Sequence, residues 1–225
     1  MLFLAVFCGF LAEYQLEHKI EKERGKQYLR SFVEDLKTDT SIFSGLIKLN
    51  EEKATELRDF VECYQTIQKG YSDSCILRLF IASGNFPDFI YTDRTLQQLK
   101  NAGGLRLIPA VDADSIIEYD KLIRQYQKIE STSYQEIQTE IRSSIYSLNS
   151  FGKTIKSFNS LDSALPKEQT NGPILFSNNK ELLNRYFNQL FIYFTGTLGN
   201  VEDIKRIREK AKSLILFFND KYNLK

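Results

Sequence analysis

The sequence predicts an all-α protein in which a long N-terminal membrane-anchor and stalk helix is followed by an antiparallel helical bundle. Three observations lead to this prediction. The 225 residues include only 4 Pro and 11 Gly, so long stretches are free of helix breakers. Apolar residues recur at steps of three and four along much of the chain. The chain also opens with an apolar run, Leu2 to Ala12, that passes without a break into a charged segment.

The apolar run is shorter than a membrane span. A helix needs about 20 apolar residues to cross a bilayer, and Glu13 ends this run. A cleaved signal peptide is disfavoured, because no basic residue precedes the run and the bulky Phe10 stands where a small residue is needed. Composition leaves two interpretations open: a buried core helix, or a transmembrane helix whose first turns are missing from the chain.

Two blocks of the sequence resemble a known family. The first is FLAEYQLEHKIEKERGKQYLRSFVEDLKTDT, Phe10 to Thr40, which contains the pattern K-x-Y-L-x-x-(L/F)-(I/V)-x-D-L-K-x-D from Lys26 to Asp39. The second is TLQQLKNAGGLRLI, Thr95 to Ile108. Both blocks resemble segments of a family of uncharacterised bacterial single-span membrane proteins, which carry a charged juxtamembrane helix and a helical domain of unknown function. The pattern residues of the first block are Lys26, Tyr28, Leu29, Phe32, Val33, Asp35, Leu36, Lys37 and Asp39.

The resemblance favours the membrane interpretation and implies no activity. We therefore expect a truncated membrane-anchor helix over residues 1–16 and a single helical domain, stalk included, over residues 17–225. The expected protein is single-pass, touches membrane lipid through its N-terminal helix, and has its helical domain outside the cytoplasm. A homo-oligomer or a protein partner is expected along the stalk.

Composition and cysteine spacing give no indication of nucleic-acid binding or of a zinc site. A net charge of +1 gives no reason to expect nucleic-acid binding, which usually requires a basic patch. With 42% apolar and 26% charged residues, the chain resembles an ordinary globular protein. Cys63 and Cys75 could form a disulfide in an oxidising compartment, although two reduced, buried thiols are slightly favoured. Their spacing is not that of a zinc site, and His18 is the only histidine.

In the first half of the chain, one continuous helix should run from Met1 to near Leu36, with its charged stalk part starting at Tyr14. Asp39, Thr40 or Ser41 could then cap a second helix that ends at Lys69. The second helix carries a heptad-like apolar seam, and the stalk is its nearest possible partner. A short helix over Cys75 to Ala82 should follow. Pro87 makes the next stretch irregular.

The middle of the chain should hold a short helix that starts after Thr92 or Asp93, ends at Lys100 and is followed by a stop at residues 101–104. Leu105 to Ile108 should be extended. Asp112 or Asp114 should then cap a helix that reaches Ile129.

Three more helical stretches complete the prediction. After a break at residues 131–133, the longest apolar seam runs from Tyr134 to Phe158. A loop containing Pro166, Gly172 and Pro173 should cover residues 161–179. Two further helices should cover residues 181–195 and 201–222, with Gly196 and Gly199 breaking the chain between them.

No catalytic, cofactor-binding or metal-binding residue is predicted. Ser147 to Thr154 ends like a phosphate-binding loop but has Ser where the motif needs its first Gly. Ser150 and Lys153 have the S-x-x-K spacing without its companion motifs. We therefore expect no enzyme, no cofactor and no metal. The expected function is that of a structural or protein-interaction module; the alternative is a sensor-like helical bundle that binds a small ligand.

Overall fold

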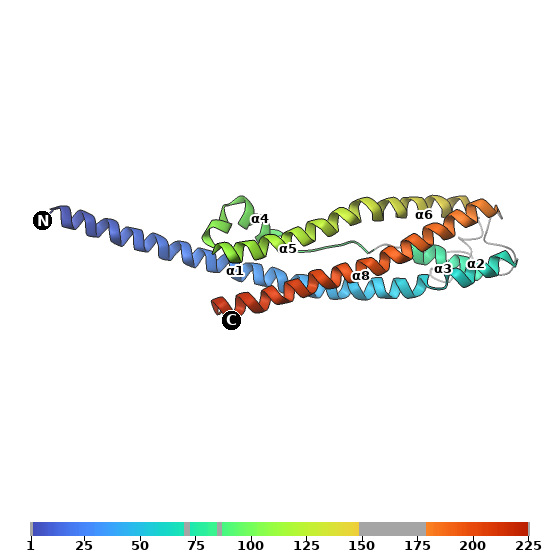
Figure 1. Cartoon of the computed structure of the whole chain (residues 1–225), viewed down its shortest axis with the longest axis horizontal. Helices are drawn as coiled ribbons and strands as arrows, with labels where there is room; N and C mark the ends of the chain where they lie inside the picture. Colours follow the sequence, from blue (N-terminus) through green and yellow to red (C-terminus); the bar gives the residue numbers. More distant parts are fainter. Residues whose placement is uncertain (1, 70–72, 85–86, 149–178, 225) are drawn as a thin grey trace, which may run out of the picture. The chain divides into compact units, whose positions relative to one another are not determined.

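The computed structural model describes residues 2–69, 73–84, 87–148 and 179–224, and this part of the chain contains helices and no strand. The predicted all-α class is therefore confirmed. Figure 1 shows the elements along the chain. They are α1 (Leu2–Leu57), α2 (Phe60–Gln68), α3 (Asp73–Gly84), α4 (Arg94–Asn101), the 3-10 turn η1 (Gly104–Leu107), α5 (Ala110–Ile129), the π-helical turn η2 (Glu130–Tyr134), α6 (Gln135–Leu148) and α8 (Lys180–Tyr222).

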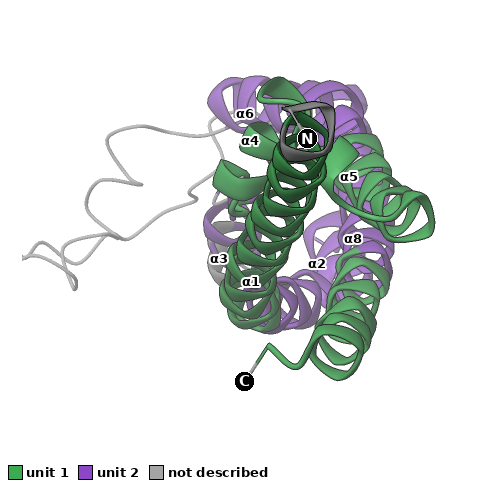
Figure 2. Ribbon diagram, turned by 90° about the vertical axis from the view of Figure 1, so that its left-hand side faces the viewer, with its two compact units in different colours: residues 1–45, 90–126, 204–225 green, residues 46–89, 127–203 purple. Residues whose placement is uncertain are grey.

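The chain divides into two compact units (Figure 2). Unit 1 comprises Met1–Gly45, Ile90–Tyr126 and Ile204–Lys225, and unit 2 comprises Leu46–Phe89 and Gln127–Asp203. This division does not test the predicted segments 1–16 and 17–225, which stay a prediction. Each unit has its own set of buried apolar side chains. In unit 1 they include Leu29, Phe32, Val33, Leu36, Leu99, Ile116, Ile123, Ile207 and Phe218.

α1 is longer than predicted. The expected break at residues 39–41 does not occur, and α1 continues through them. The carboxylate of Asp39 is not free to cap a new helix, because it accepts hydrogen bonds from the Thr92 backbone N–H (2.6 Å) and the Tyr119 hydroxyl (2.9 Å). The Thr40 hydroxyl donates to the Lys37 carbonyl, a bond that a continuing helix accommodates. The predicted packing of a separate second helix against the stalk is therefore wrong, since the first part of that helix belongs to α1.

Three other predicted breaks are also corrected. Residues 105–107 lie in the helical turn η1 and are not extended. Residues 131–133 lie in the π-helical turn η2. Gly196 and Gly199 lie inside α8, which is one helix. At Gly196 the absence of a side chain lets the Tyr134 ring pack close to the helix backbone, since a Cβ there would lie 3.2 Å from that ring.

The caps predicted for α5 are also corrected. Asp112 and Asp114 lie inside the helix, which begins at Ala110. The backbone N–H of Asp112 bonds to the Pro109 carbonyl, so the helix starts from the proline. The side chain of Asp112 is fully buried. Its carboxylate accepts hydrogen bonds from the Lys221 amine of α8, at 2.6 Å to one oxygen and 2.8 Å to the other, and from the Tyr222 hydroxyl.

Several predicted elements are confirmed. Residues 87–93 are irregular, and α4 follows them as expected. The apolar seam that begins at Tyr134 is buried through Ile137, Ile141 and Leu148. The rest of that seam, the S-x-x-K pair and the predicted loop up to residue 178 lie outside the described residues.

Unit 2 combines an apolar core with buried polar groups. The Ser83 and Tyr186 hydroxyls lie 3.2 Å apart in a hydrogen bond, and the Tyr134 hydroxyl donates to that of Thr197 at 2.9 Å. The amine of Lys53 lies 5.7 Å from the centre of the Tyr193 ring, and burial lowers its pKa to about 8. Buried polar groups of this kind favour one arrangement of neighbouring helices over others.

The seam in α6 provides a direct stability test. Ile141 is fully buried, whereas the adjacent Arg142 is exposed. Ile141→Ala should lower the free energy of unfolding by about 2–5 kcal/mol, because it removes buried methyl groups and leaves a cavity. Arg142→Ala should change it by no more than about 0.5 kcal/mol. Chemical denaturation of both variants measures the contrast, and equal midpoints would show that this face of α6 is not core.

Candidate interaction surface

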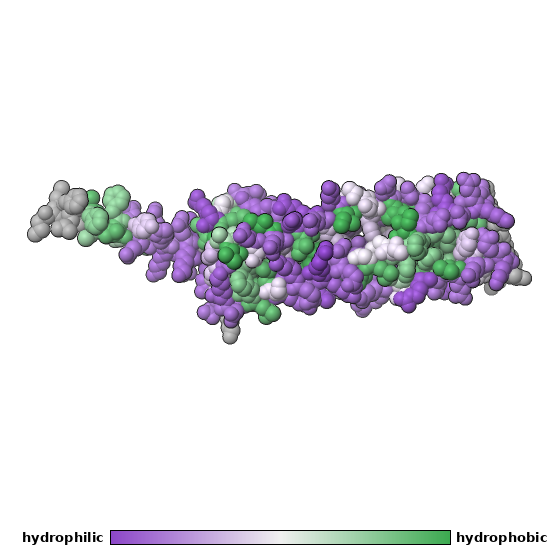
Figure 3. Space-filling model, viewed as in Figure 1, coloured by the Kyte–Doolittle hydropathy of each residue, from purple (hydrophilic) through white to green (hydrophobic). Residues whose placement is uncertain are grey.

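The first part of α1 is exposed to solvent, and its first residues are mostly apolar. Residues 6–24 are all exposed, and Gly25 is the first buried residue after them. Figure 1 shows this part of α1 extending beyond α4, α5 and the end of α8 in unit 1. In Figure 3 an apolar patch lies at the start of α1 and gives way to hydrophilic surface. The exposed large apolar residues of the first part of α1 are Val6, Phe7, Phe10, Leu11, Tyr14, Leu16 and Ile20.

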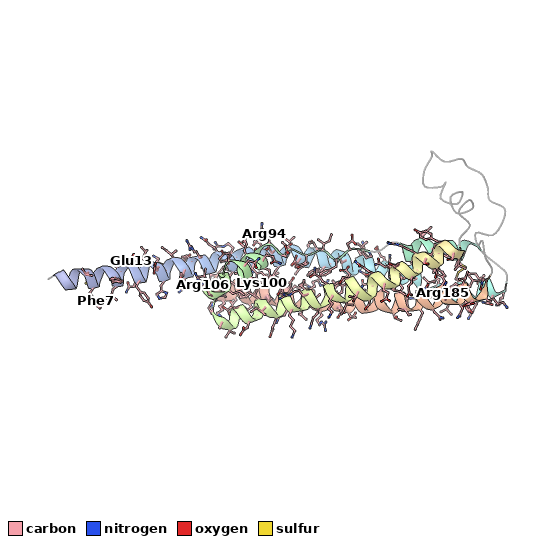
Figure 4. The ribbon with its side chains drawn as sticks, turned by 90° about the horizontal axis from the view of Figure 1, so that it is seen from above. Phe7, Glu13, Arg94, Lys100, Arg106 and Arg185 are labelled. Atoms are coloured by element: carbon pink, nitrogen blue, oxygen red, sulfur yellow. A yellow bond between two sulfur atoms is a disulfide. The ribbon has the colours of Figure 1, made fainter. Side chains whose placement is uncertain are left out.

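The aromatic residues of this patch share one helix face. Phe7, Phe10 and Tyr14 follow one another at steps of three and four, which places them on one stripe of an α-helix. Their exposed fractions are 52%, 72% and 60%. Figure 4 labels Phe7 and, about two turns on, Glu13, where the charged part begins. We call residues 6–14 the apolar segment. Exposed apolar patches of this kind mark interaction sites.

The part of α1 that follows the apolar segment carries both acidic and basic residues. Acidic Glu13 and Glu17 come first, and over residues 19–24 three basic residues alternate with two acidic ones. His18 stacks edge-on against Tyr14, with ring centres 4.3 Å apart, and lies 3.8 Å from a Glu21 oxygen. These contacts stay within α1 and are exposed, so they add little stability.

Two buried carboxylates hold the rest of α1 in unit 1. Asp35 is 3% exposed and accepts hydrogen bonds from the Thr95 backbone N–H (3.0 Å) and the Arg94 guanidinium (2.9 Å). One turn further on, Asp39 binds Thr92 and Tyr119 as described above. Thr95 lies in the first turn of α4, where backbone N–H groups lack partners within their own helix. The two carboxylates therefore bind both the start of α4 and the loop before it; we call them the carboxylate clamp.

Burial affects the ionisation of Asp39. It raises the pKa of Asp39, and the hydrogen bonds from Thr92 and Tyr119 oppose this effect. The pKa of the Tyr119 hydroxyl is also raised, first by burial and then by the neighbouring Asp39 charge. Tyr119 is therefore a neutral hydrogen-bond donor to Asp39 at ordinary pH.

The two sequence blocks that resemble the uncharacterised family lie against each other. A Cβ added to Gly25 would lie 2.3 Å from the Leu107 carbonyl oxygen, and one added to Gly104 would lie 3.4 Å from the Tyr28 ring. Asp35 of the first block binds Thr95 of the second. The acidic residues of the pattern, Asp35 and Asp39, together with Gly25 just before it, hold α4, the loop before it and η1 against α1.

Residues considered for chemistry are not brought together. Among the described residues, no group of three or more His, Cys, Asp or Glu could hold a metal ion. His18 is exposed, and Asp112 binds Lys221 and Tyr222. Cys63 and Cys75 form a disulfide, so the slightly favoured interpretation as reduced thiols is wrong. Of the phosphate-loop-like segment, only Ser147 and Leu148 lie within the described residues.

The predicted single-pass membrane location is corrected. Within the described residues, no helix combines the length and the apolar character that a membrane crossing requires. The reason lies in α1 itself, because Glu13 near the end of the apolar segment, followed by Glu17 and Lys19, limits the length of its apolar run. The long N-terminal helix is present, and its role as a membrane anchor is not supported.

Comparisons with known proteins add no identification: no family model, no curated protein and no solved structure matches the chain. The resemblance to uncharacterised bacterial membrane proteins therefore stays a prediction.

The clamp can be tested by removing one carboxylate. Asp35→Ala should lower the free energy of unfolding by about 2–3 kcal/mol, because the buried Thr95 N–H loses its acceptor. Glu34→Ala is the matched control, since Glu34 is exposed and its carboxylate accepts a hydrogen bond from Lys37 of the same helix. It should cost no more than about 0.5 kcal/mol. Equal losses in chemical denaturation would contradict the clamp.

Proposed function

We propose that the chain is a helical protein-interaction module, not an enzyme, and that it forms a homodimer through the apolar segment of α1. The observation that carries this proposal is the exposure of residues 6–24 on a helix whose later residues are buried. Short helices without tertiary contacts are marginal in water, because most helical stability comes from packing an apolar face. A helix in this position gains the missing packing from a partner.

A second copy of the chain fits this surface in an antiparallel arrangement. Parallel pairing along the Phe7–Phe10–Tyr14 stripe would continue into Glu17 against Glu17 of the second copy, which is unfavourable. Antiparallel pairing about Phe10 and Leu11 places Phe7 opposite Tyr14 and separates the acidic residues of the two copies. The contact is isologous and buries aromatic rings on both sides. Because the segment is short, we expect a dimer that dissociates on dilution.

Sedimentation equilibrium of the full chain, from about 1 to 200 µM, tests this proposal. The wild-type protein should shift from monomer to dimer across this range, and Phe10→Asp should remain monomeric because it places charge at the centre of the contact. Leu216→Asp is the matched control: Leu216 lies in unit 1 on α8 and is 72% exposed, the same fraction as Phe10. A monomer at every concentration, or equal dissociation by both variants, would refute the proposal.

Cysteine cross-linking distinguishes the orientation. In a Cys8→Ser background, mixed Phe7→Cys and Tyr14→Cys chains should form a disulfide between unlike copies if the pairing is antiparallel. Parallel pairing would instead give disulfides between like copies. The same gel therefore reports which orientation occurs.

A second candidate function, a helical domain that binds a small ligand, is favoured by a groove of about 420 Å³ in unit 1. The groove is lined in part by Arg24, Tyr28 and Arg106, all after the apolar segment. The two functions are compatible, since they use different residues of α1.

A further inference from the structure

The groove lies where α1 meets the region of α4 and η1 in unit 1. From α1 it is lined by Arg24, Gln27, Tyr28 and Ser31, and from the other side by Gln98 and Arg106. Gln27 and Tyr28 lie three and four residues after Arg24, and Ser31 lies four and three residues after them, so all four share one face of the helix. Figure 4 places Arg106 on the turn beside α1.

The groove is preformed by backbone packing. Gly25 lies one residue after Arg24 and makes the closest approach to Leu107, whose carbonyl oxygen would be 2.3 Å from an added Cβ. Leu107 follows Arg106 directly. The two arginines therefore come from chain segments that touch through backbone atoms, and a ligand would not need to draw them together.

The chemistry of the lining favours an anion. Neither Arg24 nor Arg106 forms an ion pair with a carboxylate of the described residues, although several other basic side chains in unit 1 do. Glu21 on the groove is the one acidic residue of the lining, so the two guanidinium groups leave a net charge of +1. The glutamine amides and the Ser31 and Tyr28 hydroxyls add neutral hydrogen-bond donors.

We propose that this groove binds a small molecule bearing a phosphate or pyrophosphate group. Guanidinium groups bind such oxyanions through two parallel N–H···O bonds, and a phosphate offers more acceptor oxygens than a carboxylate for the surrounding donors. A groove of about 420 Å³ accommodates a phosphorylated metabolite rather than a bare ion. The inference rests on the second candidate function and not on dimer formation.

Isothermal titration of the full chain with pyrophosphate at low salt tests the proposal. We expect saturable binding with one site per chain. Arg24→Gln and Arg106→Gln should each weaken it about tenfold or more, and Glu21→Gln should strengthen it by removing the opposing charge. Arg30→Gln is the matched control, because Arg30 is exposed on α1 and lies outside the groove. It should leave the affinity within about twofold.

Three results would overturn the proposal. One is the absence of saturable binding, and the second is an equal loss of affinity in Arg30→Gln, which would indicate general charge attraction. The third is tighter binding of citrate than of pyrophosphate, which would indicate a carboxylate site. Far-UV circular dichroism of each variant confirms that it is folded. Sedimentation equilibrium reads out the dimer separately, so failure of either candidate function can be told from failure of the other.

Discussion

The carboxylate clamp is the interaction on which unit 1 depends. Asp35 and Asp39 lie one turn apart on α1 and are both almost fully buried, which is costly for carboxylates unless hydrogen bonds compensate. Here the compensation comes from backbone N–H groups at Thr92 and Thr95, the Arg94 guanidinium and the Tyr119 hydroxyl. One pair of side chains thus binds α4, the loop before it, and α5. The same contacts explain why α1 does not break where its sequence offers a cap.

Support of α1 begins before the clamp, at Gly25. From Gly25 onwards the helix meets η1 and the core of unit 1, and before it the helix is exposed. The apolar segment lies entirely on the unsupported side. An exposed stripe of aromatic residues costs stability in water and gains it on association. The groove between Arg24 and Arg106 lies at the boundary, where α1 first touches another part of the unit.

Much of the fold could be predicted from local pattern, and the site could not. The spacing of Tyr134, Ile137 and Ile141 identified a buried helix face, and Pro87 identified the irregular stretch before α4. The predicted helix ends were less accurate because the deciding contacts are distant in sequence: Asp39 binds Tyr119 and Asp112 binds Lys221. Gly196 predicts a break by its residue type, yet α8 continues through it and the Tyr134 ring packs against it. The length of the apolar run alone could not separate a truncated membrane span from a buried core helix, and in the structure its described residues are exposed.

Amide hydrogen exchange on the full chain tests the central claim most directly, namely that α1 is supported within unit 1 from Gly25 onwards and by a second copy before it. At low micromolar concentration, amides of residues 6–24 should exchange rapidly while those of residues 29–43 stay protected. At high concentration, protection should rise in the apolar segment and remain unchanged in residues 29–43. Strong protection of residues 6–24 at every dilution, or none at any concentration, would contradict the account.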